Sequence, residues 1–318
     1  MFYEQFKSTR SVLLLLPTMY ARREISFSTV SPLHSVGFWQ LTKCSDLAVG
    51  AGRDELSLIY EEAENFQALP TFGMIPFFTP DVVHHHRNIF PNFTLGQSLL
   101  AEHYLEIRKY PIPTSGNLTT TSKLLGVLDK GNSAIAITGY TTRDSVTDEI
   151  VFYNEVTFFM RGCGGFGGQR EPSGGMSMGS ASPRYALPVD RAPDAVAEYK
   201  TSKEQAALYR LTGDTISMHI DPKVSVQGGF PTPILHGACF MGIAGKQIFE
   251  RYGAFKSIKV KFSGLVIPGD TLKTDIWKER GSQVNWVLFR MTVVETGKIC
   301  IAGGVVELVN PVKTEGKL

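Results

Sequence analysis

The chain has few cysteines, little net charge and no long apolar run, and each shortage excludes a class of protein. Its four cysteines show no CxxC spacing, so we expect neither a disulfide framework nor a cysteine zinc site, but an intracellular protein with reduced thiols. Its 32 lysines and arginines nearly balance 30 acidic residues and form no cluster that would bind nucleic acid. No stretch approaches the ~20 apolar residues of a membrane span, so no membrane partner is expected.

The composition indicates a folded protein with two domains. Apolar residues make up 43% of the 318 residues and charged ones 19%, which is typical of globular chains large enough for two cores. We assign 1–40 to a leader that fits no element, 41–170 to a first domain, 171–190 to a linker, 191–310 to a second domain and 311–318 to a tail. The chain ends in Gly316-Lys317-Leu318, one residue away from a Ser-Lys-Leu peroxisomal address, so the expected location is the peroxisome or the cytoplasm.

A glycine-rich segment, GCGGFGG at 162–168, separates the two domains. A GxGxxG-like pattern can be fitted to it, but a phosphate-binding loop follows a strand and opens a helix. Here Gln169, Arg170, Glu171 and Pro172 follow, and then more glycine and serine. The segment is therefore interpreted as a linker, and no nucleotide cofactor is expected.

In the second domain a loop precedes an apolar stretch that predicts one buried helix. Pro233 suits the first helical position and Gly253 the residue just past the end, and the residues between them are apolar on most sides. Their small members are expected to let a sheet approach closely. Alternating apolar residues then predict antiparallel strands at 258–262, 272–276, 284–288 and 301–309. One buried helix wrapped by an antiparallel sheet is a hot-dog arrangement.

The first domain is a looser copy of the second. Strand-like runs occur at 104–107, 134–140 and 150–160. Its helix is harder to place, because glycine and proline interrupt both candidate segments, 46–52 and 69–76. The predicted fold is therefore α+β, a double hot-dog whose first, degenerate repeat supplies a binding surface while the second supplies the chemistry.

An acid and an imidazole mark the chemistry. Asp214 and His219 lie between Gly213 and Pro222, which favour a loop in which both side chains converge on one water. His219 would take a proton from that water, and Asp214 would orient the water or the imidazole. The alternative is a loop entering a helix, in which Asp214 caps backbone amides and Asp221 pairs locally.

Gly237 lies in the first turn of the predicted buried helix. Amides there carry the positive end of the helix dipole and can stabilise an enolate oxygen; the alternative is a glycine kept small for packing. His236 by itself is interpreted as a core histidine. The run His84-His85-His86 is interpreted as a solvated loop, because adjacent residues cannot all face one ion, and no metal site is predicted.

The motifs of residues 46–309 resemble those of a known family. They are DLAVGAG, YEEAENFQALPTFG, LDKG, RGCGGFGG, APDAV, YRLTGD…HIDP, GGFPTPILHG and IKVKFSGLVIPGDTL. The chain resembles the enoyl-CoA hydratase 2 family, the MaoC-like double hot-dog domains of peroxisomal multifunctional enzymes type 2, as a divergent fungal-type member. The resemblance implies a hydro-lyase that reversibly hydrates (2E)-enoyl-CoA to (3R)-3-hydroxyacyl-CoA without a cofactor, with acyl-CoA as its partner.

The family's signature, Gly-Asp-x-Asn-Pro-Leu-His-x-Asp-Pro, corresponds to GDTISMHIDP here. The resemblance assigns catalysis to Asp214 and His219 and the oxyanion contact to Gly237. It further implies that Lys130 and Phe262 contact the CoA thioester. Glu61 matches a supporting acid.

Two departures set the chain apart from that pattern. Ile216 replaces the asparagine whose amide helps to position the water, with Ser217 in place of the next proline, and Leu100-Ala101 replaces a His-Gly pair at an acyl-CoA contact. We place Ile216, Leu100 and Ala101 among the substrate-binding residues and expect a specialised substrate, such as an intermediate of secondary metabolism. Two alternatives remain: a non-catalytic acyl-thioester binder, and an isomerase or cyclase using the same residues. A homodimer is compatible with all three readings.

Overall fold

The computed structural model describes residues 26–27, 38–77, 86, 89–90, 93–171, 186–279 and 285–309. Several predictions lie outside these residues: most of the leader, most of the linker, His84 and His85, and the tail with Gly316-Lys317-Leu318. His86 is described, and it is buried rather than solvated as we expected, because its ring packs against Phe90, Phe93 and Phe158.

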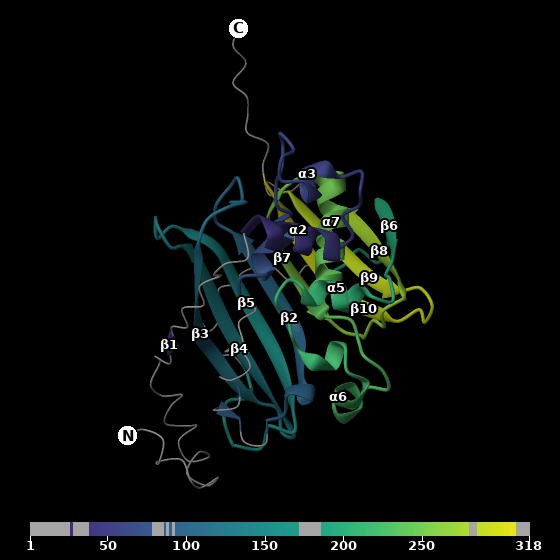
Figure 1. The fold of residues 1–318 in the computed structure, drawn as a ribbon. Helices are drawn as coiled ribbons and strands as arrows, with labels where there is room; N and C mark the ends of the chain where they lie inside the picture. Colours follow the sequence, from purple (N-terminus) through teal and green to yellow (C-terminus); the bar gives the residue numbers. More distant parts are fainter. Residues whose placement is uncertain are drawn as a thin grey trace.

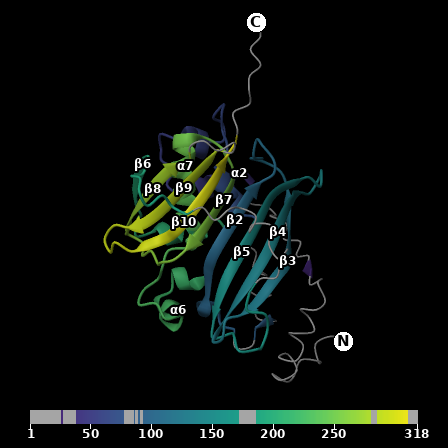
Figure 2. The same cartoon turned by 180° about the vertical axis from the view of Figure 1, so that it is seen from behind.

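One antiparallel sheet of ten strands forms the framework of the described residues, in the order β1-β3-β4-β5-β2-β7-β10-β9-β8-β6 (Figure 1). Seen from behind, the strands run as one curved layer (Figure 2). The strands are β1 (Ser26–Phe27), β2 (Ser98–Ile107), β3 (Leu118–Asp129), β4 (Ser133–Asp144), β5 (Ile150–Arg161), β6 (Ala195–Lys200), β7 (Phe255–Phe262), β8 (Thr271–Lys278), β9 (Trp286–Val293) and β10 (Ile299–Leu308).

The two halves of the sheet meet where β2 pairs with β7. Residues from Glu102 opposite Lys261 to Glu106 opposite Ser257 form this junction. On its other side β2 pairs with β5, and the register shifts between Leu100 and Glu102. Ala101 is thus the extra residue of a β-bulge, which bends a strand and redirects its side chains.

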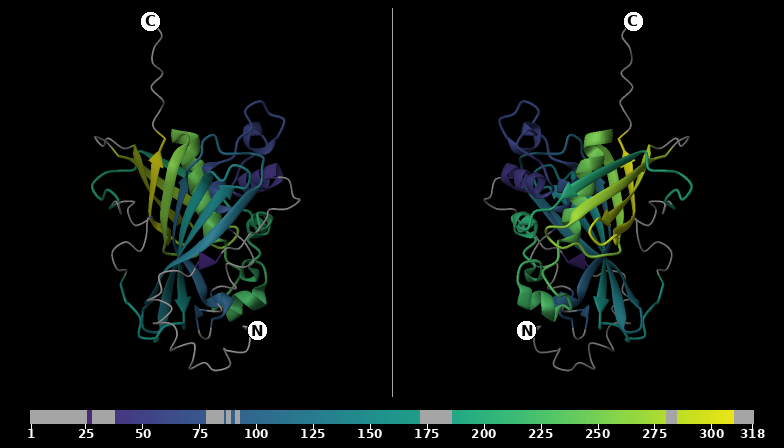
Figure 3. Two further views of the ribbon diagram at one scale, coloured as in Figure 1. Left: turned by 90° about the vertical axis from the view of Figure 1, so that its left-hand side faces the viewer. Right: turned by 90° about the vertical axis from the view of Figure 1, so that its right-hand side faces the viewer.

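The helices lie on one face of the sheet (Figure 3). They are α2 (Phe38–Ala48), α3 (Leu56–Ile59), α5 (Gln205–Arg210), α6 (Pro222–Gln227) and α7 (Gly237–Tyr252), with the short 3-10 helices η1 (Pro70–Met74), η2 (Leu95–Gln97) and η4 (Ser217–His219). Ten of the sixteen residues of α7 are buried. The first half has no helix of comparable length among the described residues. Two shorter helices take its place: α2 ends within the candidate segment 46–52, and η1 lies within the candidate segment 69–76.

The predicted end of α7 is confirmed and its predicted start is wrong. Gly253 follows the helix with a φ of 82° and donates its N–H to the Phe249 carbonyl. The helix begins at Gly237, not at Pro233, because the Leu235 N–H donates to the Val266 carbonyl at 2.7 Å. This contact holds the preceding residues extended, so His236 becomes the N-cap.

The small residues of α7 admit irregular segments of the first half as well as the sheet that we expected. A Cβ built on Gly242 would meet the Val49 side chain, and one on Gly245 would meet Thr71. Val49 directly follows α2, and Thr71 belongs to η1. The glycines therefore let the first half's irregular segments pack onto the second half's helix.

The alternating strands of both halves appear where they were predicted, with Val284 outside the described residues. In contrast, β3, β6 and β1 were not foreseen, and β1 lies within the segment that we had assigned to a leader. All four cysteines, Cys44, Cys163, Cys239 and Cys300, are free. Among the described residues, no helix combines the length and the hydrophobicity that crossing a membrane requires.

Candidate active site

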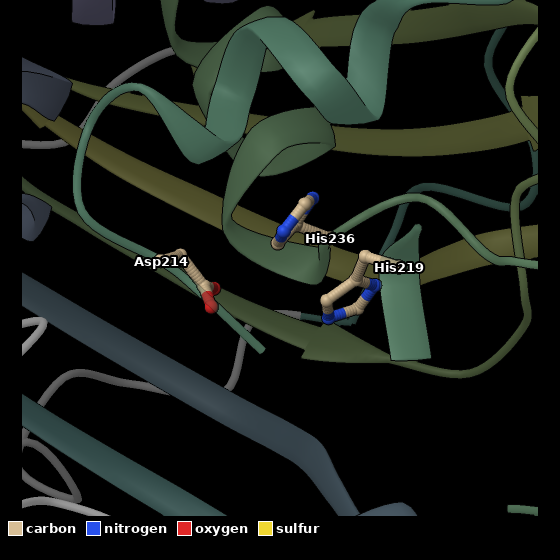
Figure 4. A group of neighbouring side chains, drawn as sticks. All are labelled: Asp214, His219 and His236. Carbon is tan, nitrogen blue, oxygen red and sulfur yellow. The ribbon is translucent and has the colours of Figure 1, made fainter. Parts of the chain in front are cut away.

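Asp214 and His219 come from the segment that joins α5 to α6. The chain leaves α5 through Gly213, whose φ of 112° favours glycine, and His219 ends the single turn η4. Both side chains are buried, with exposures of 6% and 7%. Figure 4 shows them facing a common space together with His236.

The His219 ring is held in one tautomer. Its Nδ1 lies 2.8 Å from the Ile234 carbonyl oxygen, which can only accept, so Nδ1 carries the proton and Nε2 keeps its lone pair. Burial, with a smaller contribution from Arg210, lowers the pKa of His219 to about 4, against the opposing effect of the hydrogen bond to Ile234. The ring is therefore a neutral base at pH 7.

Burial acts on Asp214 in the opposite sense. It raises the pKa of the carboxyl to about 6, against the lowering effects of a hydrogen bond from the Ile216 N–H and of Arg210. The Ile216 N–H donates to Asp214 Oδ1 at 3.3 Å, and Arg210 donates to the Ile216 carbonyl at 3.3 Å. A carboxyl with this pKa exchanges protons near neutral pH, as an acid–base group needs.

His236 completes a cluster with these two residues. One ligand atom from each of Asp214, His219 and His236 lies within 4.8 Å of the other two. The His219 and His236 rings are stacked, with centroids 3.7 Å apart and planes 29° apart. The same three atoms are also a possible donor set for a metal ion.

The N-terminus of α7 stands over this cluster. Gly237 is its first residue, and the first amides of a helix have no intrahelical acceptor. A Cβ built on Gly237 would lie 3.1 Å from Leu100 Cδ2 and 3.4 Å from Phe262 Cε1. The structure therefore brings three predicted site residues together: Gly237, Leu100 and Phe262. Ala101 occupies the bulge beside Leu100.

The structure does not bring Lys130 and Glu61 into contact with the cluster of Asp214, His219 and His236. Lys130, in the β3–β4 turn, pairs with Glu171 at 2.8 Å and donates to the Arg170 carbonyl. Lys130 thus contacts the residues that directly follow the glycine-rich segment. Glu61 is exposed and forms an ion pair with Lys43 of α2.

Ile216 reaches the site through its backbone. Its N–H binds Asp214 and its carbonyl binds Arg210, as described above, while its half-buried side chain packs against the cluster of Met218, Phe230 and Ile234. Asp221 caps α6 by accepting from the Lys223 N–H at 2.8 Å, which is the local role that the alternative interpretation gave it.

Two residues of the cluster were missed from the sequence. His236 was interpreted as a core histidine, and Arg210 was not singled out. The available signals were the position of Arg210 four residues before Asp214 and that of His236 directly before Gly237.

Comparison with known proteins identifies the family. A family model described as MFE-2 hydratase 2 N-terminal domain matches residues 44–162, and one described as MaoC-like domain matches residues 185–302. A probable enoyl-CoA hydratase 2 of Dictyostelium discoideum is 36% identical over 84% of this chain and 89% of its own length. The chain belongs to the enoyl-CoA hydratase 2 family.

Longer relatives and solved structures agree with this family assignment. The peroxisomal hydratase-dehydrogenase-epimerase of Neurospora crassa is 50% identical over 83% of this chain, which spans 28% of that protein. The peroxisomal multifunctional enzyme type 2 of Drosophila melanogaster superposes with a TM-score of 0.74 at 32% identity, over 94% of this chain and 52% of that one. A MaoC-like dehydratase from Phytophthora capsici gives 0.76 at 29% identity, over 93% and 99%. A Mycobacterium tuberculosis protein described as a double hotdog fold matches at TM-score 0.56 and 15% identity, which confirms the predicted fold.

Proposed function

We propose that this chain catalyses the reversible addition of water to (2E)-enoyl-CoA, giving (3R)-3-hydroxyacyl-CoA. The observation that carries the proposal is the meeting of a buried carboxyl and a neutral, tautomer-fixed imidazole beneath the N-terminus of α7. Relatives named enoyl-CoA hydratase 2 support it.

Hydration begins with the thioester oxygen at the amide of Gly237. His219 Nε2 takes a proton from water while the water oxygen bonds to C3 of the acyl chain. The C2–C3 π electrons move toward the thioester, and the resulting enolate oxygen is stabilised by the helix N-terminus. The Asp214/His219 pair then returns one proton to C2, and the C=O bond re-forms. The reverse sequence expels the hydroxyl as water.

The acid–base assignment follows from the environment of each group. Ionised Asp214 accepts a hydrogen bond from the water and orients it, and His219 carries the proton. Protons move only among water, substrate and these side chains, and hydration changes no oxidation state overall, so no redox partner enters the balance.

The substrate contacts follow from the residues around Gly237. Leu100 and Phe262 are proposed to contact the acyl thioester from the two halves of the sheet. Lys130, in the β3–β4 turn beside Arg170 and Glu171, is proposed to contact the CoA moiety further out. The apolar Leu100, where the family pattern has histidine, is the feature that we connect with a specialised acyl chain.

Purified protein tests the proposal. Wild type is expected to interconvert crotonyl-CoA or 2-decenoyl-CoA and the 3R product, as resolved by chiral chromatography. Asp214→Asn and His219→Ala should each lower kcat by about 10³-fold, the scale of lost acid–base catalysis. The matched control is Asp221→Asn, an acid of the same segment that caps α6, which should keep the rate. Acyl-CoA binding without turnover in wild type would instead establish the binder.

We further propose a peroxisomal location, supported by the names of the Neurospora crassa and Saccharomyces cerevisiae relatives. A fluorescent protein carrying the last residues of this chain at its free C-terminus should enter peroxisomes, and more completely when Gly316 is replaced by Ser. A cytosolic signal from both fusions would contradict the role given to the tail.

A further inference from the structure

His236 has an environment that the reaction described above does not use. Its side chain is 1% exposed, and among the described residues neither ring nitrogen makes a hydrogen bond of regular geometry, although the Asp214 backbone carbonyl lies near enough to raise the pKa of the ring. Other buried histidines are bonded: His103 Nε2 lies 2.8 Å from Asn154 Oδ1, and His219 Nδ1 is held by Ile234. Because buried polar groups are nearly always satisfied, the unbonded nitrogens of His236 point to a bound molecule as their partner.

The cluster geometry allows a single oxygen atom to contact all three residues. The ligand atoms of Asp214, His219 and His236 lie within 4.8 Å of one another. Three atoms so spaced have a common point no farther than 4.8/√3, about 2.8 Å, from each, which is hydrogen-bond length. One oxygen atom at that point reaches all three residues.

We propose that His236 is a third catalytic residue, which donates a hydrogen bond to the water that adds to C3. The proposal rests on the proposed hydration and deepens it. The water donates one hydrogen to the Asp214 carboxylate and the other to His219 Nε2. It accepts the N–H of His236, and its remaining lone pair attacks C3.

The protonation state of His236 suits this role. Burial, reinforced by His219 and Arg210, holds its pKa well below the usual range, although the Asp214 backbone carbonyl opposes the shift. The ring is therefore neutral, with one N–H to donate and one bare nitrogen. Ile216, the neighbouring position on the loop, brings no polar side chain to the water, so the imidazole is the donor available there.

The stacked arrangement also serves the proton transfer. When His219 takes the proton from water it becomes an imidazolium, and the π-face of His236 lies against it at 3.7 Å. A neutral aromatic face stabilises an adjacent cation. His236 therefore acts on both products of that step, the hydroxide-like oxygen and the charged ring.

Substitutions of His236 distinguish the role of its ring nitrogens from the role of its ring in packing. His236→Phe keeps a flat ring against His219 and removes both nitrogens, so kcat for enoyl-CoA hydration should fall about 10²-fold, as for loss of one donor in a reacting site, with KM near the wild-type value. His236→Gln restores an N–H donor and should recover at least tenfold of that loss. His236→Ala should regain activity when imidazole is added. The matched control is His103→Gln, another buried histidine, which should leave kcat unchanged.

The outcomes are distinct. A folded His236→Phe with wild-type kcat shows that the ring only packs and overturns the proposal. If the Phe variant does not fold, the His236→Ala variant decides. Activity of the Ala variant at the wild-type level without imidazole, or a loss of its activity that imidazole does not restore, overturns the proposal. Wild-type protein without hydration of any enoyl-CoA removes the proposed function itself, and this inference with it.

Discussion

Gly237 and Leu100 oppose each other where the two halves of the sheet meet, and a Cβ on Gly237 would lie 3.1 Å from Leu100 Cδ2. Two roles for this glycine predict different behaviour. As a packing residue it avoids Leu100, whereas as an oxyanion contact it leaves its amide open to the thioester oxygen.

A pair of substitutions separates these roles. Gly237→Ala should lower kcat at least tenfold, because the added methyl stands beside the amide that holds the enolate, while helix propensity keeps the fold stable. Adding Leu100→Ala removes the crowding. Recovery of the rate in the double variant would show that packing alone excludes a side chain at this position.

The pH dependence of kcat/KM should report the carboxyl. His219, with a pKa of about 4, is predominantly neutral above that value, whereas Asp214 ionises as the pH rises through about 6. Activity should therefore rise with pH and level off above about pH 7. Arg210→Gln keeps a donor to Ile216 but removes the charge that favours ionised Asp214, so the rise should move to higher pH. A profile unaffected by Arg210→Gln would contradict this electrostatic account.

Asp214 should destabilise the native protein at neutral pH. Its pKa is raised from 3.8 to about 6 in the folded state, so the folded state binds this proton more tightly, and stability is lost as the pH rises between those values. The shift corresponds to roughly 3 kcal/mol. Asp214→Asn should raise the free energy of unfolding at pH 7.5 by up to this amount, with little gain at pH 3.5. Denaturant unfolding at both pH values, with Asp221→Asn as control, measures the difference.

The sequence predicts those elements whose cause is local. The end of α7 at Gly253 and the alternating strands β7, β8 and β10 follow from residue pattern alone. The Thr-rich β3, LTTTSKLLGVLD, does not alternate clearly and was missed, and β6 is a short edge strand whose partner, β8, is distant in the chain. The start of α7 depends on the bond from Leu235 to Val266, which only the folded chain reveals.

The same distinction applies to the site. The spacing of Asp214 and His219 within one loop made them visible as a pair, and whether they act together stays a prediction. The contact of Leu100 with Gly237 arises from the pairing of β2 with β7, and the stacking of His236 on His219 from the entry of α7. Neither has a counterpart in the spacing of residues along the chain.

Ile216 gives the last prediction. Its side chain packs against Met218, Phe230 and Ile234, and its backbone holds Asp214 and Arg210. Ile216→Asn therefore places an amide in an apolar cluster and should lower the free energy of unfolding by about 1–3 kcal/mol. It should not raise kcat for short enoyl-CoA substrates, because the water already has three partners in the proposed site. Ile216→Val, which keeps the apolar contacts, is the control and should match wild type in rate and within ~1 kcal/mol in stability. A faster Asn variant would place residue 216 at the water and make His236 a packing residue after all.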